Sequence, residues 1–228
     1  MKIVFLNIWN ARRTEQVRDF FLDLRDSVDV ICIQEAFEQA QNVCEEVFKD
    51  YKKHTAIKTL NDLEDFRLAT YINNSFKIID NKTLLANETD AGLALNIQIT
   101  ANGETLNICN VHGKSRPGDK LDTQGRIKQS KVIAEYTKSS NGKTIIGGDF
   151  NLSKNTDSIK LFSSYGFSNL IENYNIPTTR NQLAWNVYPT NPQLYADYVF
   201  TDPTVNIKNF EVVNNLVSDH LPMILEIL

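Results

Sequence analysis

Six apolar segments of this 228-residue chain end in, or are interrupted by, polar residues that can do chemistry. Burying a polar group without a partner costs several kcal/mol, and burying an ionised carboxylate costs more. Six such positions in one chain therefore predict that strand ends converge and satisfy one another around something cationic. The residues are Asn7, Glu35, His112, Asp149 with Asn151, Asp197, and Asp219 with His220.

The oxygen-bearing members of this set predict a hard divalent cation such as Mg²⁺ or Mn²⁺. Carboxylate and amide oxygens are the ligands that such cations prefer, and no grouping of Cys and His indicates zinc. The oxygen donors are Asn7, Glu35, Asp149, Asn151 and Asp219.

Two of the three histidines, His112 and His220, belong to the same set. An imidazole near its ordinary pKa moves protons or, when charged, stabilises a phosphoryl oxygen. Asp197 is a natural partner for one of them, because a carboxylate fixes the tautomer of the ring to which it is hydrogen-bonded. The third histidine, His54, stands apart in "YKKHTA" and is expected to be exposed.

The elements that position these residues can be read from hydrophobic periodicity and turn signals. Asn102-Gly103 between two alternating runs is a strong hairpin signal. In the first helix, Thr14 is the expected N-cap, and Gly166 is expected to close the last one. Strands are expected at 2–8, 28–35, 68–73, 76–80, 144–151, 194–200, 207–213 and 221–228, with a hairpin over 93–113 and helices at 14–27, 38–51, 123–139 and 158–166. Many strands with interspersed helices indicate layered α and β structure with mixed sheets.

Composition predicts one domain over residues 1–228, with enough apolar residues (42%) for a core. The first residues are too short an apolar run for a secretory segment, and no run approaches the roughly 18 apolar residues that cross a bilayer. The three cysteines lack C-x-x-C spacing, which favours buried reduced thiols and a cytoplasmic location. We expect no association with a membrane and no obligate protein partner. The net charge of −4 disfavours tight sequence-blind binding of DNA.

Six motifs, in order and each at an expected strand end, resemble the endonuclease/exonuclease/phosphatase family over residues 3–225. They are Leu-Asn-Ile-Trp (6–9), Ile-Gln-Glu (33–35), Asn-Val-His-Gly (110–113), Gly-Asp-Phe-Asn (148–151), Ala-Asp-Tyr-Val-Phe (196–200) and Ser-Asp-His-Leu-Pro (218–222). Gly-Asp-x-Asn alone is common in loops, whereas the ordered set is specific. The resemblance implies an α+β fold, a four-layer α/β/β/α sandwich of two mixed, mostly antiparallel sheets flanked by helices.

The resemblance also implies a role for each residue of the set. Glu35 would be the principal metal ligand, with Asn7 and Asp219 beside it. Taken singly, each has a structural explanation: Glu35 can cap a helix, Asp219 can form a turn, and Asn10 competes with Asn7.

The same resemblance assigns the catalytic groups. Asp149 would orient or deprotonate the attacking water, and Asn151 would hold the scissile phosphate. His220, held by Asp197, would bind or protonate a phosphate oxygen, and His112 would stabilise the transition state from the other side.

A basic stretch follows His112, with six Lys or Arg residues against two Asp between Lys114 and Lys131. By itself it is a solvated loop and helix face, but Lys114 and Arg116 lie close enough to His112 in sequence to meet substrate phosphates. Arg180 is a further candidate for phosphate binding.

The two tryptophans, Trp9 and Trp185, have two possible roles. Each is able to stack on a base or another aromatic group, and each is equally suited to core packing.

Three functions are compatible with the residues. The first, which is the function that we expect from the sequence, is a metal-dependent phosphodiesterase that acts on nucleic acid, favoured by the family and by the basic stretch. The second is a phosphatase or phosphodiesterase on a small phosphorylated metabolite or nucleotide, favoured by the acidic net charge and the short chain. The third, a non-catalytic binding module, is disfavoured because every catalytic position is occupied. His112 stands where the apurinic-site repair branch of the family tends to have tyrosine, which points to the other branches.

Overall fold

The computed structural model describes residues 1–60, 64–187, 189–190 and 192–228, and it contains two six-stranded sheets. The first has the order β11-β12-β1-β2-β4-β3, from β1 (Lys2–Asn7), β2 (Val30–Gln34), β3 (Tyr51–Leu60), β4 (Glu64–Asn73), β11 (Ile207–Val212) and β12 (Met223–Ile227). The second has the order β5-β6-β7-β8-β10-β9, from β5 (Lys77–Leu84), β6 (Leu93–Ala101), β7 (Glu104–His112), β8 (Lys143–Asp149), β9 (Ser168–Asn169) and β10 (Asp197–Thr201).

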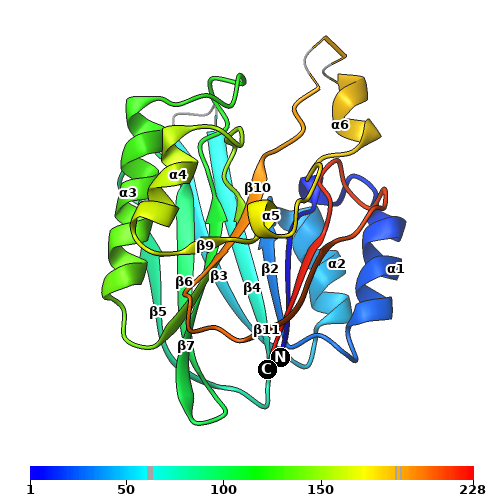
Figure 1. Ribbon diagram of the computed structural model, residues 1–228. Helices are drawn as coiled ribbons and strands as arrows, with labels where there is room; N and C mark the ends of the chain where they lie inside the picture. Colours follow the sequence, from blue (N-terminus) through cyan, green and yellow to red (C-terminus); the bar gives the residue numbers. More distant parts are fainter. Residues whose placement is uncertain (61–63, 188, 191) are drawn as a thin grey trace.

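Helices cover the outer face of each sheet, so the fold is the α/β/β/α sandwich that the motifs imply (Figure 1). Helices α1 (Thr14–Leu24) and α2 (Glu38–Val47) pack on the first sheet, and α3 (Gln124–Ser139) and α4 (Asp157–Ser164) on the second. Three short helices, η1 (Trp9–Ala11), α5 (Leu170–Asn173) and α6 (Gln182–Val187), lie in connections. No helix of the described residues is long and apolar enough to cross a membrane.

Side-chain alternation along β1 shows how the sequence builds these layers. Ile3 and Phe5 belong to the core between the sheets, whereas Val4 and Leu6 pack under α1 and α2. Asn7 continues the row of Ile3 and Phe5, so its polar side chain enters the space between the sheets at the end of the strand. The same alternation in β2 directs the Gln34 side chain into the space between the sheets, in the row of Val30 and Cys32.

A buried polar layer closes the apolar interior beneath that edge. The Asn110 amide of β7 donates to the Ile33 and Ala69 carbonyls and to Thr70 Oγ1 of the first sheet, each at 3.2 Å. Its Oδ1 accepts from Gln34 Nε2 at 2.6 Å. Because these bonds satisfy the amide only in one relative position of the sheets, they fix how the two sheets face each other.

Most of the expected elements are confirmed, with differences at some of their ends. The hairpin turns at Asn102 and Gly103, both with positive φ (51° and 80°). Arg13, not Thr14, is the N-cap of α1; the Thr14 hydroxyl instead donates to the Ala11 carbonyl. The second helix ends at Val47, and Tyr51 begins β3, a strand that the sequence did not predict.

Each sheet has one parallel pair, β1 with β2 and β7 with β8; the other neighbours are antiparallel. The carboxyl ends of both parallel pairs lie at the same edge of the sandwich, opposite the chain termini (Figure 1). This edge carries the candidate site.

Candidate active site

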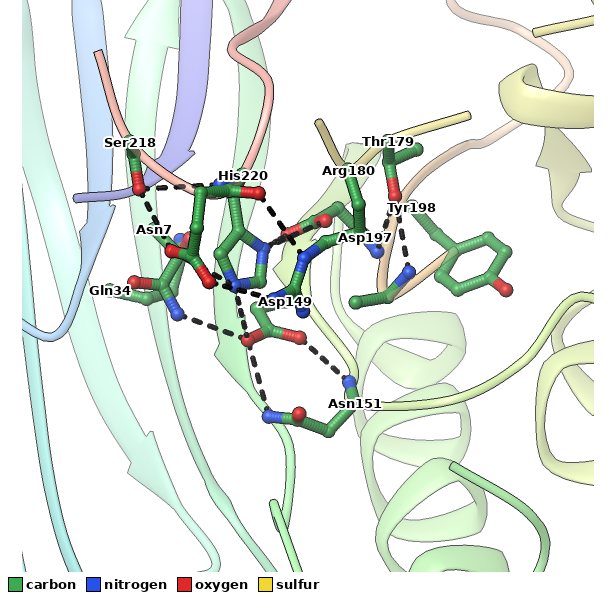
Figure 2. A network of polar contacts seen from close by, with 12 residues as sticks. Asn7, Gln34, Asp149, Asn151, Thr179, Arg180, Asp197, Tyr198, Ser218 and His220 are labelled. Atoms are coloured by element: carbon green, nitrogen blue, oxygen red, sulfur yellow. Dashed lines mark hydrogen bonds and ion pairs between the residues drawn. The ribbon is translucent and has the colours of Figure 1, made fainter. Parts of the chain in front are cut away.

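The ends of the parallel strands place the predicted residues in register. Asn7 lies beside Gln34 at the ends of β1 and β2, and His112 beside Asp149 at the ends of β7 and β8. Asp197, the first residue of β10, is the antiparallel partner of Asp149. Figure 2 shows the side chains of Asn7 and Gln34 from the first sheet and of Asp149 and Asp197 from the second converging at this edge.

The two glycines before Asp149 are required by close contacts, Gly147 with the facing sheet and Gly148 with the neighbouring strand β7 and by its positive φ. A Cβ on Gly147 would lie 2.7 Å from the Phe5 ring of the facing sheet. Gly148 has a φ of +132°, and a Cβ there would lie 2.2 Å from the Val111 carbonyl oxygen. Glycine is therefore the residue that lets β8 reach this position.

Asp149 is the centre of the polar network. Its Oδ2 accepts from Asn7 Nδ2 at 3.0 Å and from Asn151 Nδ2 at 3.2 Å, and its Oδ1 accepts from the Asn151 backbone N–H at 2.8 Å. The Nε2 atoms of His220 and His112 lie 3.7 Å and 3.9 Å from Oδ2. One carboxylate thus joins the two sheets and faces two imidazoles.

The charges around Asp149 keep it ionised. Burial by itself raises the pKa of this carboxyl, but the charges of His220, Lys120, His112 and Arg180 outweigh burial and lower the pKa to about 2. A buried carboxylate held in its charged form is suited to accept a proton or to orient a water.

His220 is fixed by Asp197. Its Nδ1 lies 2.8 Å and 2.9 Å from the two carboxylate oxygens, which leaves Nε2 facing Asp149. Asp197 is itself held by Thr179, a fully buried residue whose Oγ1 accepts from the backbone N–H groups of Ala196 and Asp197 at 3.1 Å and 3.2 Å (Figure 2). Thr179 was not singled out from the sequence, because a hydroxyl in a loop gives no signal of its own.

The pKa values of both residues of this pair are raised, that of His220 by neighbouring charges and that of Asp197 by burial. Burial and Arg180 lower the pKa of His220, but Asp197, Asp219 and Asp149 outweigh them and raise it above 6.5. Burial raises the pKa of Asp197, against the lowering effect of His220. His220 is therefore prepared to carry a proton toward the cleft.

The residues for a divalent cation fit at the edge of the cleft. Glu35 has a φ of 54° directly after β2 and accepts from Asn7 Nδ2 at 3.2 Å through Oε1. Asp219 also lines the cleft, with its Oδ2 bonded to Arg180 Nη2 at 2.7 Å. Mg²⁺ is usually held by one or two carboxylates with water and substrate phosphate, so this sparse oxygen donor set suits it. In this arrangement Asn7 holds Glu35 through its Nδ2 group, and its Oδ1, the atom that could bind a cation, accepts from the Trp9 N–H at 3.0 Å.

One carboxylate oxygen of Asp149, one of Asp197 and one ring nitrogen of His220 also lie within 4.8 Å of one another, a spacing that metal ligands show. However, both Asp197 oxygens face His220 Nδ1, and both Asp149 oxygens accept hydrogen bonds. We therefore interpret this trio as an acid–base arrangement, in which Asp197 is hydrogen-bonded to His220 Nδ1 and the Asp149 carboxylate lies 3.7 Å from His220 Nε2.

Lys120 is a site residue that the sequence reading did not separate from the basic stretch. It is 5% exposed, lines the cleft, and donates from Nζ to Asn151 Oδ1 at 2.6 Å. Burial lowers the pKa of this lysine. Its loop is organised by the fully buried Arg126, which donates to the Leu121 carbonyl at 2.6 Å and to the Ser115 carbonyl at 3.2 Å.

Lys114 and Arg116 are not brought into the cleft. Lys114 Nζ donates to the Thr89 carbonyl at 3.1 Å and lies 3.4 Å from Asp90. Arg116 is exposed, and among the described residues neither side chain lines the cleft. Arg180, in contrast, is 5% exposed and lines it.

The cleft itself has a volume of about 190 Å³. Acid, base and cationic groups form its floor and walls, and Trp9 and Val187 are its larger apolar residues. Its chemistry is that of a pocket for a small anion, with a general base, a proton donor and room for a cation at one side.

Comparisons with known proteins agree with this geometry. Residues 4–220 match the model of the "Endonuclease/Exonuclease/phosphatase family", and no curated protein matches. Similar solved structures include a mannosyl-6-phosphatase from Bacteroides thetaiotaomicron, with a TM-score of 0.80, 16% identity, and coverage of 100% of this chain and 99% of that one. A family protein from Leptotrichia buccalis has a TM-score of 0.76 and 20% identity, with coverage of 100% of this chain and 99% of that one. The human Nocturnin catalytic domain has a TM-score of 0.72 and 17% identity, with coverage of 100% of this chain and 93% of that one. At such identities these likenesses concern the fold.

Proposed function

We propose that this chain, which belongs to the endonuclease/exonuclease/phosphatase family, hydrolyses a phosphate ester in the cleft around Asp149 with a divalent cation. Members of this family are hydrolases that act on phosphate esters. The observation that carries the proposal is the ionised Asp149 carboxylate between His220 and His112, at 3.7 Å and 3.9 Å, in a small pocket that Lys120 and Arg180 also line.

Asp149 prepares the water. The hydrogen bonds from Asn7 and Asn151 hold its carboxylate in one orientation, and its low pKa keeps it ionised. It orients a water molecule toward phosphorus and accepts its proton as the new P–O bond forms and the ester P–O bond breaks.

His220 and the cations stabilise the negative charge that gathers on the phosphoryl oxygens. His220 donates from Nε2 while Asp197 holds Nδ1, and His112 acts from the β7 side. Lys120 and Arg180 supply further positive charge, and Lys120 also fixes Asn151 through its hydrogen bond.

The cation side of the cleft is formed by Glu35, with Asn7 donating to it and Asp219 nearby. When bound there, Mg²⁺ or Mn²⁺ would neutralise charge on phosphate and on the leaving oxygen. Asn7 Nδ2 donates to both Glu35 and Asp149, so the same amide links the cation side of the cleft to the general base.

For the substrate we prefer a small phosphorylated metabolite or nucleotide to a nucleic acid. The basic stretch was the local argument for nucleic acid, but several of its cations are engaged by the protein. Lys114 pairs with Asp90, Lys128 with Glu88, and Arg126 is fully buried. The net charge of −4, the cleft volume of about 190 Å³ and the likeness to a mannosyl-6-phosphatase support the same choice.

The three cysteines take no part in this chemistry. Cys32, Cys44 and Cys109 are free and buried, and burial raises the pKa of each thiol, that of Cys109 to about 12. Reduced thiols suit a reducing compartment, so a cytoplasmic location is part of the proposal.

The test is a substrate panel with Mg²⁺ or Mn²⁺, with the Asp149→Asn variant as control. The panel contains sugar and inositol phosphates, nucleotides, tyrosyl-linked ends, abasic DNA, RNA, and single- and double-stranded DNA. We expect kcat/KM to be highest on a small phosphate ester and to fall by about 10²–10³ or more in the variant. Faster cleavage of oligonucleotides with a steep salt dependence would instead select the nuclease.

A further inference from the structure

Trp9 is the aromatic side chain among the described residues that line a mostly polar cleft, in which Val187 is the other larger apolar residue. It lines the cleft with Glu35 and Lys120, whereas its neighbours Ile8 and Ala11 are fully buried in the core under α1 and α2. Among the described residues, Trp9 is a member of neither hydrophobic core. Core packing, one of the two roles open from the sequence, is thus not what places this ring.

The backbone that carries Trp9 is strained. Trp9, Asn10 and Ala11 have φ values of 49°, 50° and 52°, three consecutive residues in the left-handed region. Residues other than glycine adopt this region at a cost and seldom in succession. Asn7 Oδ1 accepts from the Trp9 N–H, and the buried Ala11 anchors the other end of the turn. The turn is thus held in place from both sides, and it presents the indole beside the metal side of the cleft.

Arg12 occupies one face of the ring. Its guanidinium carbon lies 4.7 Å from the Trp9 ring centroid. This contact restricts the orientation of the indole without filling the cleft that the same residue lines. The ring is therefore fixed before any ligand arrives, which reduces the ordering cost of stacking.

We propose that Trp9 is a stacking platform for a planar aromatic ring carried by the substrate next to its phosphate, so that the chain prefers aromatic phosphate esters to sugar or polyol phosphates. The aromatic ring belongs to a nucleobase or to a phenolic ester. This inference rests on the proposed function, because it names the substrate class of the same cleft.

The first experiment is fluorescence titration of the Trp185→Phe variant, in which Trp9 is the one remaining tryptophan. Trp185 lines a different cavity, of about 380 Å³, and among the described residues its buried Nε1 has no hydrogen-bond partner, so phenylalanine loses none. Combining it with Asp149→Asn prevents turnover. We expect nucleoside monophosphates or phenyl phosphate to quench Trp9, and glucose 6-phosphate and glycerol phosphate to leave its emission nearly unchanged. Comparing the nucleotide arm with the phenyl arm distinguishes the two sources of the ring.

The second experiment measures binding by calorimetry in Asp149→Asn with Trp9→Leu or Trp9→Phe. Leucine keeps an apolar side chain without a ring face, and phenylalanine keeps the ring. We expect Trp9→Leu to weaken aromatic ligands about tenfold and sugar phosphates by less than twofold, with Trp9→Phe close to the parent. Equal losses for both ligand classes, or an unchanged affinity in Trp9→Leu, would overturn the inference.

The two proposals fail in different ways. Binding to the Asp149→Asn protein is measured without turnover, so selective aromatic binding stands even if no ester in the panel is hydrolysed. Conversely, hydrolysis of aromatic phosphate esters with a kcat/KM that Trp9→Leu does not change would retain the hydrolase and refute the role of Trp9.

Discussion

The replacement of Asp197 by asparagine tests the arrangement that prepares His220. The Asp197 carboxylate holds His220 Nδ1 at 2.8 Å and 2.9 Å, and both residues are buried. Asparagine keeps the size of the side chain but removes its charge and presents an amide that can donate toward Nδ1. The imidazole then places its single proton on Nε2 in the neutral form, and its charged form loses its closest partner.

The size of the effect follows from the charge that is removed. Two unit charges about 4 Å apart interact by about 4 kcal/mol at an effective dielectric constant of 20. Since 1.36 kcal/mol corresponds to a factor of ten, the protonated fraction of His220 at a given pH above its pKa falls by about a thousandfold. Burial and Arg180 still lower the pKa of His220 in the variant, now with less opposition. We therefore expect kcat/KM near neutral pH to fall by about 10²–10³.

The assay is the pH dependence of kcat/KM for parent and variant. If charged His220 is the active form, activity is lost as pH rises through its pKa, and Asp197→Asn moves this alkaline limb to lower pH. With three histidines in the chain, nuclear magnetic resonance can follow the His220 ring directly. In a His220→Ala background, Asp197→Asn should cost little more, because the two act as a unit. An alkaline limb that stays in place, or a loss below tenfold, would refute the reasoning.

Three further predictions follow from the site. EDTA should abolish activity, and Mg²⁺ or Mn²⁺ should restore it. The Glu35→Gln variant should need at least tenfold more cation for its half-maximal rate, whereas the control Glu38→Gln, at an exposed position, should not. Lys120→Met should lower kcat/KM by about 10² and move its acid limb to higher pH, because the lysine charge lowers the pKa of Asp149; the exposed Lys131→Met should change it less than twofold. The pKa of Asp149 is lowered from 3.8 to about 2, so its contribution to stability is present above about pH 4 and lost as pH falls toward 2. Urea unfolding of Asp149→Asn should show a loss of about 2 kcal/mol at pH 7 that shrinks below pH 4, whereas a loss independent of pH would contradict the linkage.

The gathering of the site residues was predictable because it depends on local pattern and on sheet geometry. Asn7 and Asp149 each end an apolar run, and parallel neighbours bring their carboxyl ends to one edge. The two glycines before Asp149 indicated that the backbone leaves the strand tightly, which places Asp149 and Asn151 together at the sheet edge. The side-chain period of two then directs Asn7 between the sheets.

Other parts of the site depend on tertiary structure that no local pattern carries. Lys120 and Arg116 are close in sequence and similar in type, yet one is 5% exposed in the cleft and the other is exposed outside it. The difference arises from Arg126, whose bonds to the loop carbonyls set the path of residues 114–121. Strand β3 was not predicted because its sequence contains several lysines and few apolar residues. An edge strand with one solvated face needs little apolar sequence.

Backbone conformation at the cleft shows why the site is more than a meeting of strand ends. Trp9, Glu35, Lys120 and Asn151 all line the cleft and all have positive φ, between 49° and 58°. For residues with a Cβ, this region costs about 1–2 kcal/mol each. Glycine would remove the strain at every one of these positions, but it would also remove the indole, the carboxylate, the ammonium or the amide. The side chain, rather than the turn, therefore accounts for the choice of residue. Glu35 directly follows β2, and a left-handed residue there bends the chain at once, so that its side chain leaves the alternation of the strand and lines the cleft. Lys120 lies in a loop instead, and Arg126 holds that loop through its bonds to the Leu121 and Ser115 carbonyls.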